Sequence, residues 1–96
     1  MILAQVSISP IGTDVSVSKY VKKIVKMLEN EPITCHTNAM ATVIEAETTD
    51  QLFSAIHRAH DTLINDPGVK RVITELKIDH RTDKNATFES KVKSVT

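Results

Sequence analysis

The spacing of apolar residues changes from a period of two to a helical period, and this change occurs twice along the chain. Residues 2–9 alternate, which is typical of a strand with one buried face. Residues 16–30 carry apolar side chains at helical spacings with lysines between them, which predicts an amphipathic helix. Ser16 or Ser18 is the expected N-cap of this helix, and Pro32 prevents the helix from continuing.

A second strand region and a second helix follow. Residues 33–38 and 42–47 predict two short strands joined by a tight connection, with the first of them at a sheet edge. Thr48 followed by Gln51 has the spacing of a capping box, so the second helix is expected to begin there.

The last third of the chain predicts one long strand and one short helix. A Pro-Gly pair at residues 67–68 ends the second helix, and residues 69–79 alternate as a strand does. Residues 87–95 predict a short terminal helix led by Thr87 or Asn85.

Two successive strand–helix–strand units predict an α+β fold of the ferredoxin-like kind. With right-handed crossovers, such units form one antiparallel four-stranded sheet with both helices on one face and the first and third strands in the centre. The short C-terminal helix is an addition to this βαββαβ core. The chain has 96 residues, so a single domain over residues 1–96 is expected.

Charge and composition argue against several kinds of partner. Lys and Arg total 12 and Asp and Glu total 12, so the chain lacks the basic excess typical of proteins that bind nucleic acid or acidic membranes. No secretory signal is recognisable, and no apolar stretch approaches the roughly 20 residues of a membrane span. Cys35 is the single cysteine, so it cannot form a disulfide within the chain, and a reducing cytoplasm is the expected setting.

The alternation predicts what each face of the sheet presents. The face toward the helices would carry Ile2, Val6, Ile8, Ile44, Val72, Leu76 and Ile78. The opposite face would carry Leu3, Gln5, Ser7, Val43, Glu45, Arg71, Ile73, Glu75 and Lys77. A surface that mixes apolar side chains with hydroxyl, amide and charged groups is typical of a protein–protein interface. This open face is therefore predicted to pack against a second copy of the chain. The alternative is a solvated face neutralised by pairs such as Glu75 with Lys77.

Few side chains are spaced for chemistry. His57 and His60 share a helix face, but no further ligand completes a metal site, so a hydrogen-bonded His60 at the helix border is the favoured interpretation. Cys35 and His36 are strand neighbours that point to opposite faces, so they do not form a nucleophile–base pair. Gly12 stands between the first strand and the first helix, where it permits a ligand to approach the backbone closely.

Four segments together resemble a known family. Residues 9–13 and 16–21 resemble its opening strand, turn and helix. Residues 40–45, Met-Ala-Thr-Val-Ile-Glu, resemble its central Met-Gly-Thr-x-Ile-Glu motif, and His60 with residues 71–84 resembles its end. In this order and over nearly the full chain, the sequence resembles the small thiamine-binding proteins, which are related to the YkoF-like proteins.

The resemblance implies more than a fold. It implies a cytoplasmic protein that assembles into dimers and further into tetramers, and that binds thiamine or its hydroxymethylpyrimidine part without turnover. No other cofactor and no metal is implied. Ala41 and Ala46 stand where the family commonly has glycine, and an added methyl group at either position would narrow a pocket or alter a backbone approach.

The resemblance also implies a site for an aminopyrimidine, which offers ring acceptors and an amine donor. Thr13 and Glu45 are the leading candidates, the carboxylate for the amine and the hydroxyl for a ring nitrogen. Tyr20 would offer an aromatic face to the cationic thiazolium of thiamine. Further ligand candidates are Ser7, Gly12, Thr37 and Met40.

Two residues near the end of the chain suit a different role. Lys77 and Arg81 would hold a phosphate or contact the partner subunit. By alternation Thr42 faces the helices and Glu45 faces the open side, so these two are not expected to share one pocket.

Two alternative functions stay open at this point. One is a structural or interaction module whose sheet face serves only self-assembly, with no small-molecule ligand. The other is an enzyme that uses Glu45 with Glu75 or His60 for acid–base chemistry. No complete catalytic constellation is recognisable, so non-catalytic binding is the prediction.

Overall fold

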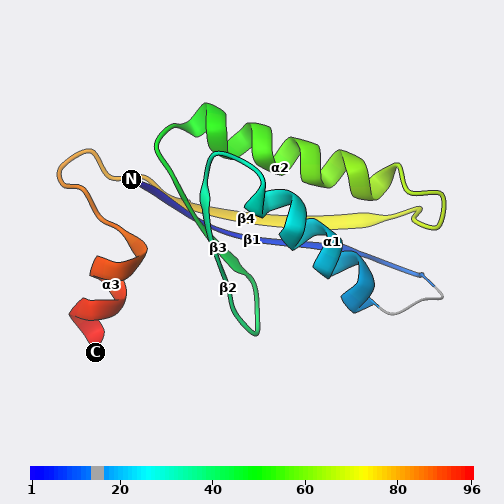
Figure 1. The fold of residues 1–96 in the computed structure, drawn as a ribbon, viewed down its shortest axis with the longest axis horizontal. Helices are drawn as coiled ribbons and strands as arrows, with labels where there is room; N and C mark the ends of the chain where they lie inside the picture. Colours follow the sequence, from blue (N-terminus) through cyan, green and yellow to red (C-terminus); the bar gives the residue numbers. More distant parts are fainter. Residues whose placement is uncertain (14–16) are drawn as a thin grey trace.

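The computed structural model describes residues 1–13 and 17–96, and its elements follow the predicted order (Figure 1). The strands are β1 (Ile2–Pro10), β2 (Thr34–Thr37), β3 (Thr42–Ala46) and β4 (Val72–Asp79). The helices are α1 (Val17–Glu29), α2 (Thr49–Ile64) and α3 (Phe88–Val95). Ser16, one expected cap of α1, lies outside the described residues, and Ser18, the other, lies inside the helix.

The sheet confirms the ferredoxin-like α+β topology. Its order is β2-β3-β1-β4 with every pair antiparallel, so the first and third strands are central and β2 is an edge as predicted. The two neighbours of β1 have different lengths. Pairing with β3 ends at Val6 opposite Thr42, whereas pairing with β4 continues to Pro10 opposite Val72. After Val6, one side of β1 therefore has no strand beside it in the part of the chain that the structure describes.

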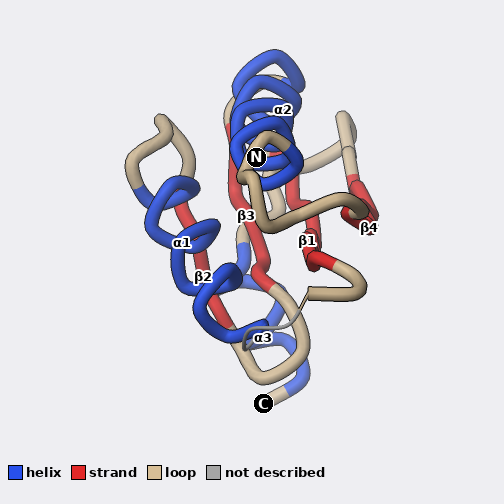
Figure 2. Tube along the Cα trace, turned by 90° about the vertical axis from the view of Figure 1, so that its right-hand side faces the viewer, coloured by secondary structure: helices blue, strands red, loops and turns tan. Residues whose placement is uncertain are grey.

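Helices α1 and α2 cover the same face of the sheet (Figure 2) and enclose the core. The core contains Ile2, Ala4, Val6, Ile8, Tyr20, Ile24, Leu28, Ile44, Ala46, Leu52, Ala55, Ile56, Ala59, Leu63 and Val69. Val72 and Leu76 pack against it as expected. Ile78 was expected in the core and remains 37% exposed, because β4 is an edge strand with open space on its outer side.

The last strand is shorter than predicted. Residues 69–79 were expected to form it, but β4 begins at Val72. The Val69 N–H donates to the Asp66 carbonyl at 2.9 Å, so residue 69 still belongs to the turn that follows α2. Val69 is nevertheless buried, which explains why its apolar character resembled that of a strand residue.

The short helix α3 lies on the other face of the sheet, near the chain's N-terminus (Figure 1). Phe88 and Val92 lie over the N-terminal part of β1, and Leu3 is only 8% exposed although it was expected on the open face. Thr87 is the N-cap of α3 and completes a reciprocal capping box with Ser90.

The capping box expected at α2 is one-sided. The Thr48 side chain accepts a hydrogen bond from the Gln51 N–H at 3.1 Å, as predicted. Gln51 does not return this contact, since its buried side-chain Oε1 accepts no hydrogen bond from any described residue. None of the helices formed by the described residues is long and apolar enough to cross a membrane.

Candidate functional site

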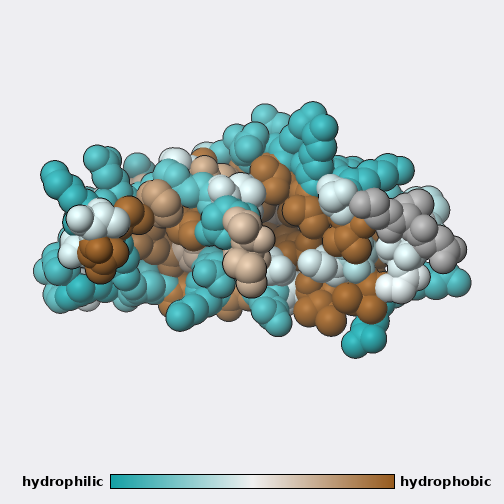
Figure 3. Space-filling view, turned by 90° about the horizontal axis from the view of Figure 1, so that it is seen from below, coloured by the Kyte–Doolittle hydropathy of each residue, from teal (hydrophilic) through white to brown (hydrophobic). Residues whose placement is uncertain are grey.

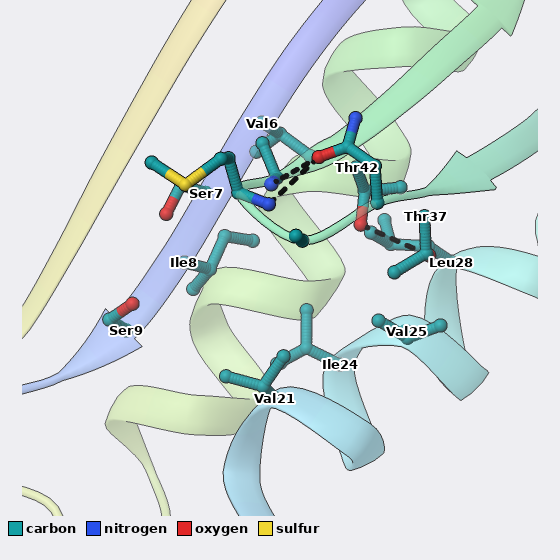
Figure 4. A pocket seen from close by; sticks show the side chains of 14 residues that line it. Val6, Ser7, Ile8, Ser9, Val21, Ile24, Val25, Leu28, Thr37 and Thr42 are labelled. Carbon is teal, nitrogen blue, oxygen red and sulfur yellow. Dashed lines mark hydrogen bonds between the residues drawn. The ribbon is translucent and has the colours of Figure 1, made fainter. Parts of the chain in front are cut away.

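A cavity of about 210 Å³ lies beside the part of β1 that follows Val6, where β1 is no longer paired with β3. We call this cavity the α1–hairpin pocket (Figure 4). It lies between β1, one flank of α1 and the turn that joins β2 to β3. Its lining consists of Val6, Ser7, Ile8 and Ser9 from β1; Val21, Ile24, Val25 and Leu28 from α1; and Thr37, Asn38, Ala39, Met40, Ala41 and Thr42 from the hairpin. The valine and isoleucine side chains of β1 and the apolar side chains of α1 therefore form the walls of the pocket. The backbone of β1 and the hairpin supply its polar groups.

The hairpin turn is fixed by its first residue. Asn38 Oδ1 accepts hydrogen bonds from the Met40 N–H at 2.8 Å and the Ala41 N–H at 3.0 Å (Figure 4). The Asn38 N–H also donates to the Ala41 carbonyl at 2.9 Å. An asparagine that satisfies the turn backbone in this way holds the chain in one conformation. Met40, 87% exposed, is thereby held at the mouth of the pocket.

Two threonine hydroxyls meet in the pocket. Thr37 Oγ1 and Thr42 Oγ1 are 3.3 Å apart and share one hydrogen bond (Figure 4). Thr42 is only 6% exposed, so its hydroxyl is a polar group in a largely apolar setting. A hydroxyl can donate once and accept twice, so the pair keeps capacity for a ligand.

The backbone of β1 offers a further polar edge. Residues Ser7–Ser9 line the pocket, and β3 no longer pairs with them. Backbone N–H and C=O groups of an antiparallel strand point to alternate sides, so at least one residue of this segment directs both groups toward the pocket. An N–H donor beside a C=O acceptor matches the edge of a heteroaromatic ring that carries an amine.

The surface around the pocket is apolar. Seen from below, hydrophobic groups gather beside the start of α1 and around the hairpin, with a hollow between them (Figure 3). The exposed apolar side chains of this region include Val17, Val21 and Met40.

Glu45 lies elsewhere, in a cluster that holds α3. His36 Nε2 donates to Glu45 Oε1 at 2.8 Å, and the Phe88 N–H donates to Glu45 Oε2 at 3.1 Å. The rings of His36 and Phe88 stack with centroids 3.8 Å apart. Burial alone would raise the pKa of the Glu45 carboxyl, but the hydrogen bonds from His36 and Phe88 outweigh burial and lower that pKa below its ordinary value. Both carboxylate oxygens thus have partners within the protein.

The pocket brings together some of the predicted ligand residues. Ser7, Thr37 and Met40 line it, and so does Thr42. Thr42 and Glu45 lie on opposite faces of β3, as the alternation predicted.

The other predicted ligand residues do not line the pocket. Gly12 is exposed with φ of 74°, a left-handed conformation that favours glycine, and Thr13 beside it is half-buried. Tyr20 belongs to the core. Lys77 lies beside α3, and Arg81 forms an ion pair with Asp83 in the following loop.

The remaining reactive side chains have structural partners. His60 Nδ1 lies 2.6 Å from Thr74 Oγ1, which confirms the hydrogen-bonded histidine at the helix border. His57 pairs instead with Asp61 at 3.3 Å. Among the described residues, no three His, Cys, Asp or Glu side chains are placed to hold a metal ion. Cys35 is a free thiol packed against the core, and burial raises its pKa.

The acid–base pair of Glu45 and Glu75 is not formed. Glu45 lies opposite Leu3, and Glu75 lies opposite Ser7. These positions are four residues apart on β1, or about 13 Å along the strand. Glu45 and Glu75 also belong to strands on opposite sides of β1, so they cannot act on one group.

The sequence places Asn38 in the connection between the two short strands, as the structure does, but it does not predict Asn38, Val21 or Val25 as pocket residues. Asn38 has a recognisable signal, because an asparagine between two strand patterns is typical of a turn. Val21 and Val25 looked like ordinary helix residues, since their position at the pocket depends on where β3 ends. The stack of His36 on Phe88 joins residues 52 apart in the chain, and no local pattern predicts it.

Comparisons with known proteins agree with this architecture. A family model described as thiamine-binding protein matches residues 4–96. UPF0045 protein MJ1052 of Methanocaldococcus jannaschii is 45% identical over 94 residues, which cover 98% of this chain and 91% of that protein. Its crystal structure superposes with a TM-score of 0.89 over 98% of this chain and 94% of that one.

Relatives in other organisms extend the similarity. UPF0045 protein YqgV of Bacillus subtilis is 42% identical over 100 residues, covering 99% of this chain and 94% of that protein. The crystal structure of TM0486 from Thermotoga maritima is only 16% identical but has a TM-score of 0.83, with 99% of this chain and 98% of that one covered. At that identity the likeness concerns the fold alone.

Proposed function

The chain belongs to the thiamine-binding protein family, and we propose that it binds thiamine, or the hydroxymethylpyrimidine part of thiamine, in the α1–hairpin pocket without turning it over. The observation that carries this proposal is the edge of β1 at Ser7–Ser9, which faces the pocket and is not paired with any strand formed by residues 1–13 or 17–96. A family described by binding supports a binding role rather than catalysis, and this role requires no metal or further cofactor.

The polar groups of the pocket match an aminopyrimidine. The ring nitrogens accept hydrogen bonds, and the exocyclic amine donates them. A strand N–H and C=O from Ser7–Ser9 would pair with one edge of the ring, and the hydroxyls of Thr37 and Thr42 would serve another. The apolar walls from Ile24 and Leu28 would contact the ring faces.

The volume of the pocket favours one ring over two. About 210 Å³ is smaller than the roughly 300–1,000 Å³ of pockets that enclose drug-sized ligands. The pyrimidine would therefore be enclosed, and the thiazolium of thiamine would lie toward the mouth near Met40. Ala41 lines the pocket, so its methyl group takes space that a glycine would leave open. The chain has no non-glycine residue at positive φ among its described residues, so alanine is unstrained there.

Assembly would complete this site. Met40 and Val21 leave an apolar rim exposed at the pocket mouth, and a second copy of the chain would cover such a rim. The predicted dimer of dimers in the cytoplasm would thus hold the ligand near a subunit boundary. Lys77 and Arg81 lie away from the pocket and would serve subunit contacts rather than the ligand.

The test is titration calorimetry with thiamine and with hydroxymethylpyrimidine, using wild type and two matched variants. Val21→Phe places a larger side chain in the pocket, and we expect it to weaken binding at least about tenfold, because the ring would lose its space. Val95→Phe makes the same change on α3, outside the lining and on the other face of the sheet, and should bind as wild type does.

Two results would overturn the proposal. Wild-type protein that binds neither compound would favour the interaction module without a ligand. Val21→Phe protein that binds as tightly as wild type would exclude this pocket as the site.

A further inference from the structure

A second cavity lies along one flank of α3 on the open face of the sheet, and we call it the α3 groove. Its volume is about 260 Å³, and it shares no lining residue with the α1–hairpin pocket. Figure 2 shows α3 on the side of the sheet opposite to α2, so the sheet separates this groove from the face that the two packed helices cover. The α3 groove is therefore distinct from the site of the proposed function.

One row of side chains across the sheet forms the floor of the α3 groove. Gln5 lies opposite Val43 of β3 and opposite Lys77 of β4, so these three side chains point to the same face. Neighbouring strands are about 4.8 Å apart, so the row extends over about 10 Å. It has an apolar end at Val43, a cationic end at Lys77 and the amide of Gln5 between them.

Helix α3 forms the wall of the groove and crosses the strands. Near its start, Phe88 stacks on His36 of β2, and one turn later Lys91 forms an ion pair with Asp79 of β4. One face of the Phe88 ring is taken by His36, so the other face or the ring edge lines the groove. Val92 lines it as well and is 43% exposed. The wall is therefore apolar along the side that faces Val43.

The polar groups of the floor have no partners within the chain. The side chains of Gln5 and Lys77 are exposed, and neither forms a hydrogen bond or an ion pair with another described residue. Among the described residues, Asp79 is the only acidic one that lines the groove, and Lys91 pairs with it. Glu75 precedes Lys77 on the same face but does not line the groove. The charge left over in the lining is therefore the positive charge of Lys77.

We propose that the α3 groove binds a small aromatic monocarboxylate. The aromatic ring lies on Val43 beside Val92 and Phe88, where it makes apolar and ring-to-ring contacts. The carboxylate lies at the other end, where the Lys77 ammonium and the Gln5 amide donate hydrogen bonds to it. A volume of about 260 Å³ is below the roughly 300–1,000 Å³ of sites for drug-sized ligands, so it suits a molecule with one ring.

Binding in this groove also holds α3 against the sheet. Helix α3 buries no side chain of its own, so its attachment has little apolar contact to draw on. A ligand that touches both Val43 and Val92 binds only while α3 is attached, so ligand binding and attachment stabilise each other. This site does not rest on the proposed function, and thiamine, a cation, is not expected to bind beside Lys77.

The experiment follows amide resonances of the full chain by NMR while 3-phenylpropanoate is added at neutral pH and constant ionic strength. Shift changes should be largest at Gln5, Val43, Lys77 and Val92. The dissociation constant should be about 1–10 mM, because so small a ligand makes few contacts. The neutral 3-phenylpropanamide keeps the ring and should bind about threefold more weakly, and an excess of thiamine should not displace either probe.

Two pairs of matched variants test the two ends of the groove. Lys77→Gln should weaken the binding of 3-phenylpropanoate about threefold and leave 3-phenylpropanamide unchanged, because only the charge is lost. Lys93→Gln removes a charge from α3 outside the groove and should bind both probes as wild type does. Val92→Ser shortens the apolar wall and should weaken both probes alike. Val95→Ser makes the same change on α3 outside the groove and should have no effect.

Amide exchange gives a readout that a loose contact with surface charges would not change. At about ten times the dissociation constant of 3-phenylpropanoate, the α3 amides should exchange about tenfold more slowly, because the probe binds only the attached helix. Thiamine should leave the exchange of α3 unchanged, since the α1–hairpin pocket contains no residue of α3.

Three results would overturn the proposal. Wild-type protein that shows no shift changes along the groove would leave Lys77 to subunit contacts, and sedimentation of the same samples would show whether a second copy occupies this face. Lys77→Gln protein that still prefers the carboxylate to the amide would exclude Lys77 as its partner. Unchanged exchange of α3 in the presence of bound 3-phenylpropanoate would place that probe outside the α3 groove.

Discussion

Helices α2 and α3 begin in the same way but are attached to the protein differently. Each has a threonine N-cap, Thr48 or Thr87, whose side chain accepts a hydrogen bond from the N–H three residues on. Helix α2 then buries five side chains, whereas α3 has no buried residue. Helix α3 is attached through the His36–Glu45–Phe88 cluster and an ion pair between Lys91 and Asp79.

This difference separates what forms a helix from what anchors it. A cap and suitable residues make a helical segment favourable locally, but a short helix gains most of its stability from an apolar face packed on the core. Helix α2 has such a face, so its unfolding is coupled to that of the whole domain. Helix α3 depends on a few polar contacts, one ring stack and the contact of Phe88 and Val92 with Leu3, so it is expected to detach without unfolding the sheet.

The largest expected effect is a loss of global stability when a buried side chain of α2 is shortened, compared with a matched change in α3. Leu52 in α2 has no exposed surface, so Leu52→Ala should lower the free energy of unfolding by about 2–5 kcal/mol. Phe88→Ala removes the ring that stacks on His36 and should leave the unfolding midpoint of the sheet nearly unchanged. Urea unfolding followed by circular dichroism checks both, and amide exchange should show α3 alone losing protection in Phe88→Ala. Equal losses of global stability would mean that α3 belongs to the same cooperative unit as α2.

A smaller loss of stability is expected when the threonine N-cap of either helix is removed. Thr48→Ala should lower the free energy of unfolding by about 1 kcal/mol, because the cap of α2 is lost from the cooperative unit. Thr87→Ala removes the same hydrogen bond from α3, and its effect should be confined to fraying of that helix. Thermal unfolding together with residue-resolved amide exchange makes the comparison. A fall in global stability for Thr87→Ala as large as for Thr48→Ala would contradict the separation.

The same contrast explains which parts of the fold were predictable. Periodicity located both packed helices and all four strands, because burial against one core imposes a spacing on the sequence. Where that spacing misled, the cause was tertiary. Ile78 alternates correctly but lies at an edge, and Leu3 alternates outward but is covered by α3. Val69 is buried in a turn, so its burial extended the predicted strand by three residues.

The candidate site was less predictable than the fold. The sequence predicts Ser7, Thr37 and Met40 as ligand residues, and the pocket brings them together only because β3 begins at Thr42 whereas β1 extends beyond Val6. The end of a strand pairing is set by the turn and by the partner strand, neither of which is encoded in one local segment. The sequence predicts Glu45 as a ligand residue. No pattern near Glu45 in the chain predicts that Phe88, 43 residues later, is its hydrogen-bond partner.

The smallest expected effect is a pH dependence in the attachment of α3. The pKa of Glu45 is lowered in the folded protein, because the hydrogen bonds from His36 and Phe88 outweigh its burial. A carboxyl with a lowered pKa stabilises the attached state fully above the pKa that it has in the unfolded chain, and this stabilisation is lost as pH falls through the lowered pKa. Attachment of α3 should therefore be constant near neutrality and weaken in acid. The Phe88 amide resonance, followed by NMR as pH is lowered, should report this change.

The control must account for a second carboxyl near α3. Lys91 lowers the pKa of Asp79, so Asp79 titrates in the same direction. Glu45→Gln keeps a hydrogen-bond acceptor for Phe88 but removes the charge, so it should abolish the larger part of the acid transition, and adding Asp79→Asn should abolish the remainder. The sheet amides should stay unchanged over this range in all three proteins, since α3 detaches without the core. An acid transition of the same size and midpoint in the Glu45→Gln, Asp79→Asn protein would show that neither carboxyl controls the attachment and that another titratable group does.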